Sequence, residues 1–105
     1  MAIVEVAAGV CGFSARIACE ADETYAVTVC VESDCPRVQE LAKRLDRVAI
    51  LSEMGKPLPE TSVYRAAGES RLHIACPVPA AMLKGIEVAA GLALPADAHI
   101  TVRRA

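Results

Sequence analysis

Aromatic residues are scarce in this sequence, and neither sign of charge predominates. Among its 105 residues, only Phe13, Tyr25 and Tyr64 are aromatic, and there is no tryptophan. Proteins that bind single-stranded nucleic acid stack the bases on aromatic side chains, and this number is too small for such a platform. Lysine and arginine total 11 against 13 aspartates and glutamates, which gives a net charge of −2. Because nucleic acids and anionic membranes are bound by basic surfaces, we expect neither as a partner.

Long apolar runs are also absent. A transmembrane helix needs about 18 consecutive apolar residues, whereas the stretches without charge, such as Val6–Ala15 and Leu72–Leu83, are interrupted by glycine or proline. Met1–Val6 has no basic residue and contains Glu5, which differs from the start of a secretory signal. We therefore expect a cytoplasmic protein without a membrane partner.

Alternating apolar residues predict strands near both ends of the chain. In the first third they cover Val4–Val10, Phe13–Cys19 and Tyr25–Val31, with the period of two that half-buried strands show. A further alternation, with Ile100 and Val102 on one side, predicts a last strand close to the C-terminal residue.

Helical spacing of apolar residues predicts three helices between these strands, over Val38–Leu45, Thr61–Ala67 and Ala80–Ala90. The first follows Ser33 and Asp34, which are both good N-cap residues, and a glycine stands directly after the third, where it favours the end of a helix. Most strands precede the helices, so we expect an α+β domain. Its antiparallel sheet has about four strands in the order βββαααβ, with the helices on one face. The length of 105 residues and a hydrophobic content of 54% predict a single folded domain over residues 1–105.

The sequence contains five cysteines, but no two of them have the Cys-x-x-Cys spacing that makes a metal site easiest to recognise. An odd number cannot be fully paired in disulfides within one chain. Reduced cysteines of cytoplasmic proteins bind metals, take part in catalysis or fill the core. Cys19 lies in register with the apolar side of its strand, so we expect it in the core. Cys30 lies on the other side of the next strand, and we assign it no role.

Cys11, Cys35 and Cys76 stand where predicted elements begin or end. Gly12 follows Cys11, and a proline follows each of Cys35 and Cys76 at the start of a predicted helix. The N–H groups and the dipole at a helix N-terminus favour an anion, so we expect these thiols to have a lowered pKa. His73 lies three residues before Cys76, and Cys₃His is a common ligand set for zinc.

Three interpretations remain open from these residues. The leading one is a metal site in which Cys11, Cys35 and Cys76 are ligands and His73 is a candidate fourth, for zinc or an iron–sulfur cluster. The second is a metal-free thiol protein in which Cys35 or Cys76 is the catalytic nucleophile and the other resolves a disulfide. The third assigns these residues a structural role in an interaction module, with the alanine-rich helix Ala80–Ala90 as a homodimer face.

Three motifs carry a resemblance. They are Ala8–Phe13 (AGVCGF), Ser33–Pro36 (SDCP) and His73–Pro79 (HIACPVP), and the similarity continues through Ala80–Pro95. In these segments the chain resembles a small uncharacterised prokaryotic family, a domain of unknown function that is frequent in anaerobic bacteria and archaea. The resemblance implies no activity. It implies that Cys11, Cys35 and Cys76 belong to the motifs by which the family is recognised.

Overall fold

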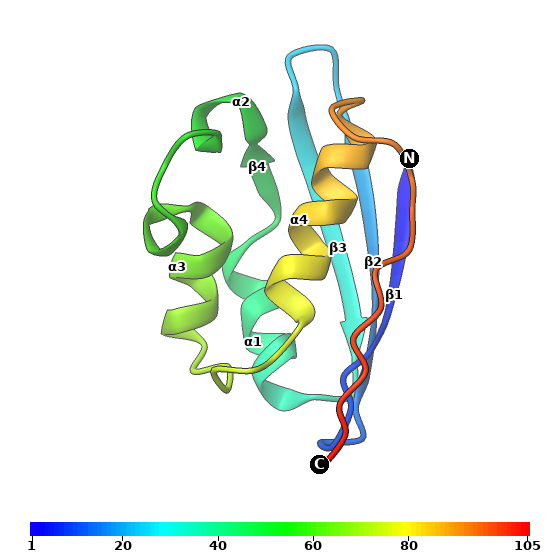
Figure 1. The fold of residues 1–105 in the computed structure, drawn as a ribbon. Coiled ribbons are helices and arrows are strands. Elements are labelled where there is room, and N and C mark those ends of the chain that lie inside the picture. Colours follow the sequence, from blue (N-terminus) through cyan, green and yellow to red (C-terminus); the bar gives the residue numbers. More distant parts are fainter.

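The computed structural model describes all 105 residues and has an α+β fold. Its three long strands come first and most of its helices follow (Figure 1). The elements are β1 (Ala2–Ala7), β2 (Ser14–Ala21), β3 (Ala26–Ser33), α1 (Pro36–Arg44), β4 (Arg47–Ala49), α2 (Ile50–Glu53), the 3₁₀ helix η1 (Leu58–Glu60), α3 (Ser62–Glu69) and α4 (Val78–Ala89). The predicted fold class is confirmed.

The sheet is antiparallel and runs in the order β1-β2-β3-β4. One of its faces carries the core, because α4 packs on β1 and β2 and α1 packs on β3. The alternation seen in the sequence places Ile17 and Cys19 of β2 on this face, both with an exposed fraction of 0%. They lie against Met82 and Ile86 of α4 in one hydrophobic cluster. The opposite face has no helix on it and carries the charged residues of the strands.

The fourth strand differs from the sequence prediction. No strand forms around Ile100 and Val102, whose exposed fractions are 80% and 88%. The chain beyond Leu92 makes no backbone hydrogen bond, so the alternating segment there pairs with no strand. The fourth strand is β4, which follows α1 and pairs with the beginning of β3. Only Val48 of its three residues is buried, and so short a segment gives no periodic signal.

The first helix begins one residue later than its best capping residues. Its N-cap is Cys35, and neither Ser33 nor Asp34 takes that position. The cause is Pro36, since a residue before proline is held out of the helical conformation. Cys35 accordingly has φ −74° and ψ 119°, and its side chain makes no capping hydrogen bond. The prediction of the N-cap was therefore wrong, and the correction leaves the Cys35 thiol without a capping role.

The end of α4 agrees with the sequence. Ala90 is the C-cap, and Gly91 follows it with φ +75°. The N–H of Gly91 donates to the carbonyl of Val88 (3.1 Å) and the N–H of Leu92 donates to that of Glu87 (2.9 Å). These two bonds form a Schellman motif, which glycine favours because it adopts positive φ without strain.

Gly85 marks the closest approach of α4 to the sheet. A Cβ atom added to this residue would lie 2.6 Å from Cγ2 of Val4 and 3.1 Å from Sγ of Cys19. The helix therefore rests on β1 and β2 at a distance that only glycine permits. No helix of the structure has both the length and the apolar character needed to cross a membrane.

Candidate functional site

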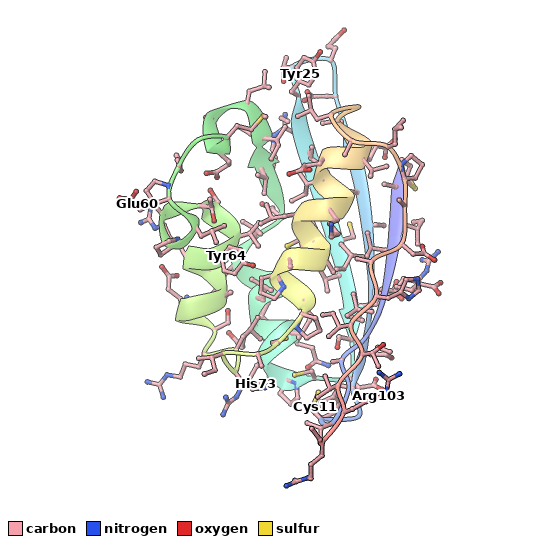
Figure 2. The ribbon with its side chains drawn as sticks, in the orientation of Figure 1. Cys11, Tyr25, Glu60, Tyr64, His73 and Arg103 are labelled. Carbon is pink, nitrogen blue, oxygen red and sulfur yellow. The ribbon has the colours of Figure 1, made fainter.

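Three connections of the fold meet at one end of the sheet. They are the β1–β2 turn, the junction of β3 with α1, and the loop between α3 and α4, which all lie at the lower end of the molecule in Figure 1. A cavity of about 430 Å³ opens between them. Figure 2 shows Cys11 and His73 at this end. The cavity is lined by Ala8, Val10, Cys11, Phe13, Ser14, Ser33, Cys35, Pro36, Arg37, Val38, Leu72, His73, Cys76 and Val78.

All four residues proposed as metal ligands thus line a single cavity. Cys11, Cys35 and Cys76 come from segments that are far apart in the sequence, and the antiparallel topology brings them together. We refer to Cys11, Cys35 and Cys76 as the cysteine cluster. The remaining cysteines lie elsewhere, Cys19 in the core and Cys30 exposed on the opposite face of the sheet.

Cys11 is carried by a tight turn that two glycines make possible. The N–H of Gly12 donates to the carbonyl of Gly9 (3.0 Å), and these residues have φ +75° and +87°. The N–H of Ala8 and the carbonyl of Phe13 close the hairpin at 3.1 Å. Cys11 is exposed. Its thiol lies 4.0 Å from the carbonyl oxygen of Ala8, at the long limit for a sulfur hydrogen bond.

Cys35 is half-buried and is positioned by Ser33. The backbone N–H of Cys35 donates to Oγ of Ser33 (3.1 Å), and that hydroxyl donates to the carbonyl of Ser14 (2.6 Å). The carbonyl of Ser33 accepts a bond from Nε2 of Gln39 (2.8 Å). Ser33 therefore ties the start of α1 to strand β2 and fixes the place of Cys35.

Cys76 and His73 are the two ends of a turn. The N–H of Cys76 donates to the carbonyl of His73 at 3.0 Å. Ile74, inside the turn, has an exposed fraction of 105%, whereas Cys76 is half-buried and His73 is exposed at the cavity rim. Cys76 stands just before Pro77, the N-cap of α4. The prediction that Cys35 and Cys76 lie at helix N-termini is confirmed.

The expected lowering of thiol pKa at these helix starts is wrong for Cys76. Burial raises the pKa of Cys76, and although the backbone N–H of Val78 acts in the opposite direction, nearby Cys35 and Cys11 raise it further. Removing a thiol from water disfavours its anion, and a neighbouring thiolate repels it. The surroundings of Cys76 therefore favour its neutral thiol, and Cys35 and Cys11 lie close enough to contribute to this effect.

The donor set of the cavity is soft. It offers three thiols and one imidazole, and no carboxylate lines it. Such ligands suit zinc, copper(I) and iron–sulfur clusters, while magnesium and calcium require oxygen ligands. No three His, Cys, Asp or Glu side chains stand in positions that would hold a metal ion without rearrangement.

Several cavity residues were not identified from the sequence. Phe13 and Leu72 form apolar walls, and Arg37 lies at the side of the cavity. The guanidinium of Arg37 donates to the carbonyl of Arg71 at 2.8 Å. Arg71 follows the C-cap of α3 with φ +56°, in a position that glycine usually occupies. The Cys35-Pro36 pair indicated that the chain around Arg37 was part of the candidate site. The sequence near Arg37 gave no indication that its side chain contacts the segment after α3.

The chain belongs to a family of unknown function, DUF6951, whose model matches residues 2–102. The match confirms the resemblance to a family of unknown function. No curated protein and no solved structure matches the chain.

Proposed function

We propose that this protein binds a thiophilic metal centre, zinc or an iron–sulfur cluster, through Cys11, Cys35 and Cys76. One observation carries the proposal: three thiols from three distant segments line one cavity, together with His73. Three thiolates and one further ligand complete a tetrahedral zinc site. Cysteine thiolates also hold iron–sulfur clusters, in which an external group can replace a fourth cysteine.

The raised pKa of Cys76 counts against this thiol as the nucleophile of the metal-free interpretation. A nucleophilic cysteine works as its thiolate and normally has a lowered pKa. Burial and the neighbouring thiols act against the anion of Cys76. A bound cation reverses this repulsion, because it stabilises several thiolates at once.

Coordination would require Cys11 and His73 to move, since no three of the donor side chains stand in position to hold a metal ion. Cys11 is exposed on a two-glycine turn, and His73 is exposed on the turn that ends at Cys76. Cys35 is held more firmly by Ser33 and forms the fixed point. In this proposal Cys11 and His73 move toward Cys35 and Cys76 when the metal binds.

A metal centre at the cysteine cluster would account for the three sequence motifs and would suit a cytoplasmic protein. Each of the motifs Ala8–Phe13, Ser33–Pro36 and His73–Pro79 supplies one member of the cysteine cluster. We place the protein in the cytoplasm, where thiols remain reduced. The prokaryotic and frequently anaerobic setting of the resembling family would suit a site that oxygen damages.

Metal content after anaerobic purification tests the proposal. Elemental analysis and an absorption spectrum distinguish the two centres: a cluster gives iron, sulfide and visible charge-transfer bands, and zinc gives a colourless protein with one metal per chain. We expect Cys35→Ser and Cys76→Ser to lose the metal while they keep the far-ultraviolet circular dichroism of a folded chain. Cys30→Ser is the matched control, because Cys30 is exposed outside the cavity.

Two outcomes would contradict the proposal. One is a folded wild-type protein that binds neither metal under these conditions, which would leave the thiol and structural interpretations. The other is equal metal content in Cys35→Ser, Cys76→Ser and Cys30→Ser. His73→Ala resolves the fourth ligand: loss of a zinc ligand lowers zinc affinity strongly, whereas a cluster held by the cysteine cluster alone retains its iron.

A further inference from the structure

The cavity is larger and more apolar than a metal ion requires. Its volume of about 430 Å³ lies in the range of small-molecule sites. Besides the thiols, its walls include five large hydrophobic side chains, those of Val10, Phe13, Val38, Leu72 and Val78. Val10 continues this surface outward, since it is fully exposed at the tip of the β1–β2 turn. Space beside the cysteine cluster is therefore shaped for an organic group.

The charge of the cavity has one sign. Arg37 is its only permanently charged residue, and no carboxylate lines it. Elsewhere in the molecule Arg44 pairs with Glu69 and Arg47 pairs with Asp22, whereas Arg37 forms no ion pair. Its one hydrogen bond is to the carbonyl of Arg71, and the exposed guanidinium has no acidic partner.

We propose that the cavity binds a small organic anion, a carboxylate with a short apolar chain, next to the metal centre. The carboxylate pairs with the free N–H groups of Arg37, whose planar fork matches its two oxygens. The apolar chain lies against Phe13 and Leu72. This inference rests on the proposed function, in which a metal centre occupies the side of the cavity that carries the cysteine cluster. It adds the class of molecule that would bind in the rest of the cavity.

Titration with sodium 3-methylbutanoate tests this inference on protein purified with its metal. Amide resonances of ¹⁵N-labelled protein locate the binding site, and the metal content of the same sample is measured first. We expect saturable shifts at Phe13, Arg37 and Leu72. Loss of a hydrogen-bonded charge partner weakens binding by about tenfold or more, so Arg37→Gln should show that loss. Arg65→Gln, an exposed arginine of α3 outside the cavity, should not.

The neutral compound 3-methylbutanamide separates charge from shape, because it has nearly the same outline. We expect it to bind about tenfold more weakly than the carboxylate. Equal binding of both compounds, shifts outside the cavity, or affinity unchanged in Arg37→Gln would overturn the inference while the metal site stands. A sample without metal would overturn the proposed function and this inference with it, and elemental analysis reveals that before any carboxylate is added.

Discussion

Replacing Gly85 by alanine tests how closely α4 is packed on the sheet. The added Cβ would lie 2.6 Å from Cγ2 of Val4 and 3.1 Å from Sγ of Cys19, well inside normal contact distances. Val4 is β-branched and stands on a strand, so its methyl group has few alternative positions. Either α4 or β1 must move for the new methyl group to fit.

Two opposing contributions set the size of the effect. Alanine is a better helix former than glycine, by about 0.5–1 kcal/mol. Forcing a methyl group into a packed core costs about 1–3 kcal/mol. We therefore expect Gly85→Ala to lower the free energy of unfolding by about 1–2 kcal/mol. For a domain of this size, each 1 kcal/mol corresponds to a fall of roughly 4–8 °C in Tm.

The structure offers a matched control for this substitution. Gly68 lies in α3, and a Cβ added there meets no atom within 4 Å. Gly68→Ala therefore gains helix propensity without a clash, and we expect it to stabilise the protein by about 0.5 kcal/mol. Urea unfolding followed by circular dichroism measures both variants, and a similar slope in both confirms that the comparison concerns the folded state.

A Gly85→Ala protein that is as stable as Gly68→Ala would refute the reasoning. A second background sharpens the test: in a Val4→Ala protein the clashing methyl group is gone, so Gly85→Ala should cost much less there. The difference between the two backgrounds measures the coupling of α4 to β1.

Three further predictions concern other parts of the molecule. Arg71→Gly should stabilise the protein by about 1 kcal/mol, because Arg71 has φ +56° and glycine adopts that angle without strain; urea unfolding that shows no gain would contradict this. The hydrogen bonds from Thr24 and Ala26 and the charge of Arg47 hold the pKa of Asp22 at about 2, below its usual 3.8. The stability from these contacts is therefore complete above about pH 4 and is lost as the pH falls toward 2; Asp22→Asn should remove that part of the acid dependence, and an unchanged dependence would refute the assignment. Burial, aided by Cys30, raises the pKa of Cys19 to about 11. Iodoacetamide near pH 8 should therefore label Cys30 in the native protein and Cys19 only after unfolding. Mass spectrometry of the peptides identifies the labelled cysteines, and label on Cys19 in the native protein would contradict this prediction.

The parts of the fold that follow from local pattern were predictable. Alternation identified β2 and β3, and the apolar side of that alternation placed Cys19 in the core. β4 was missed because its three residues pair with β3 through tertiary contacts that no local period records. The strand predicted around Ile100 does not form, for the converse reason. The segment has the alternating pattern of a strand, but it makes no backbone hydrogen bond to another strand.

The sequence singled out the members of the candidate site but not its surroundings. Whether Cys11, Cys35 and Cys76 lie together depended on the first turn and both helix starts sharing one end of the sheet, and in the structure all three line one cavity. The pKa of Cys76 is raised, whereas a lowered pKa was expected, because burial and the neighbouring thiols outweigh the effect of the helix N-terminus. Leu72 and Arg37 reach the cavity through the packing of α3 against α1, which sequence spacing does not encode.

The two edges of the sheet differ in a way that affects how the protein behaves when it is concentrated. β4 closes one edge with only three residues, too few to pair stably with a strand of another molecule. β1 forms the other edge and is twice as long, with backbone groups free on the side away from β2. Unpaired edges of this kind seed aggregation unless a charge interrupts them. Glu5, exposed in the middle of β1, is such a charge, and it opposes pairing of this edge with another molecule.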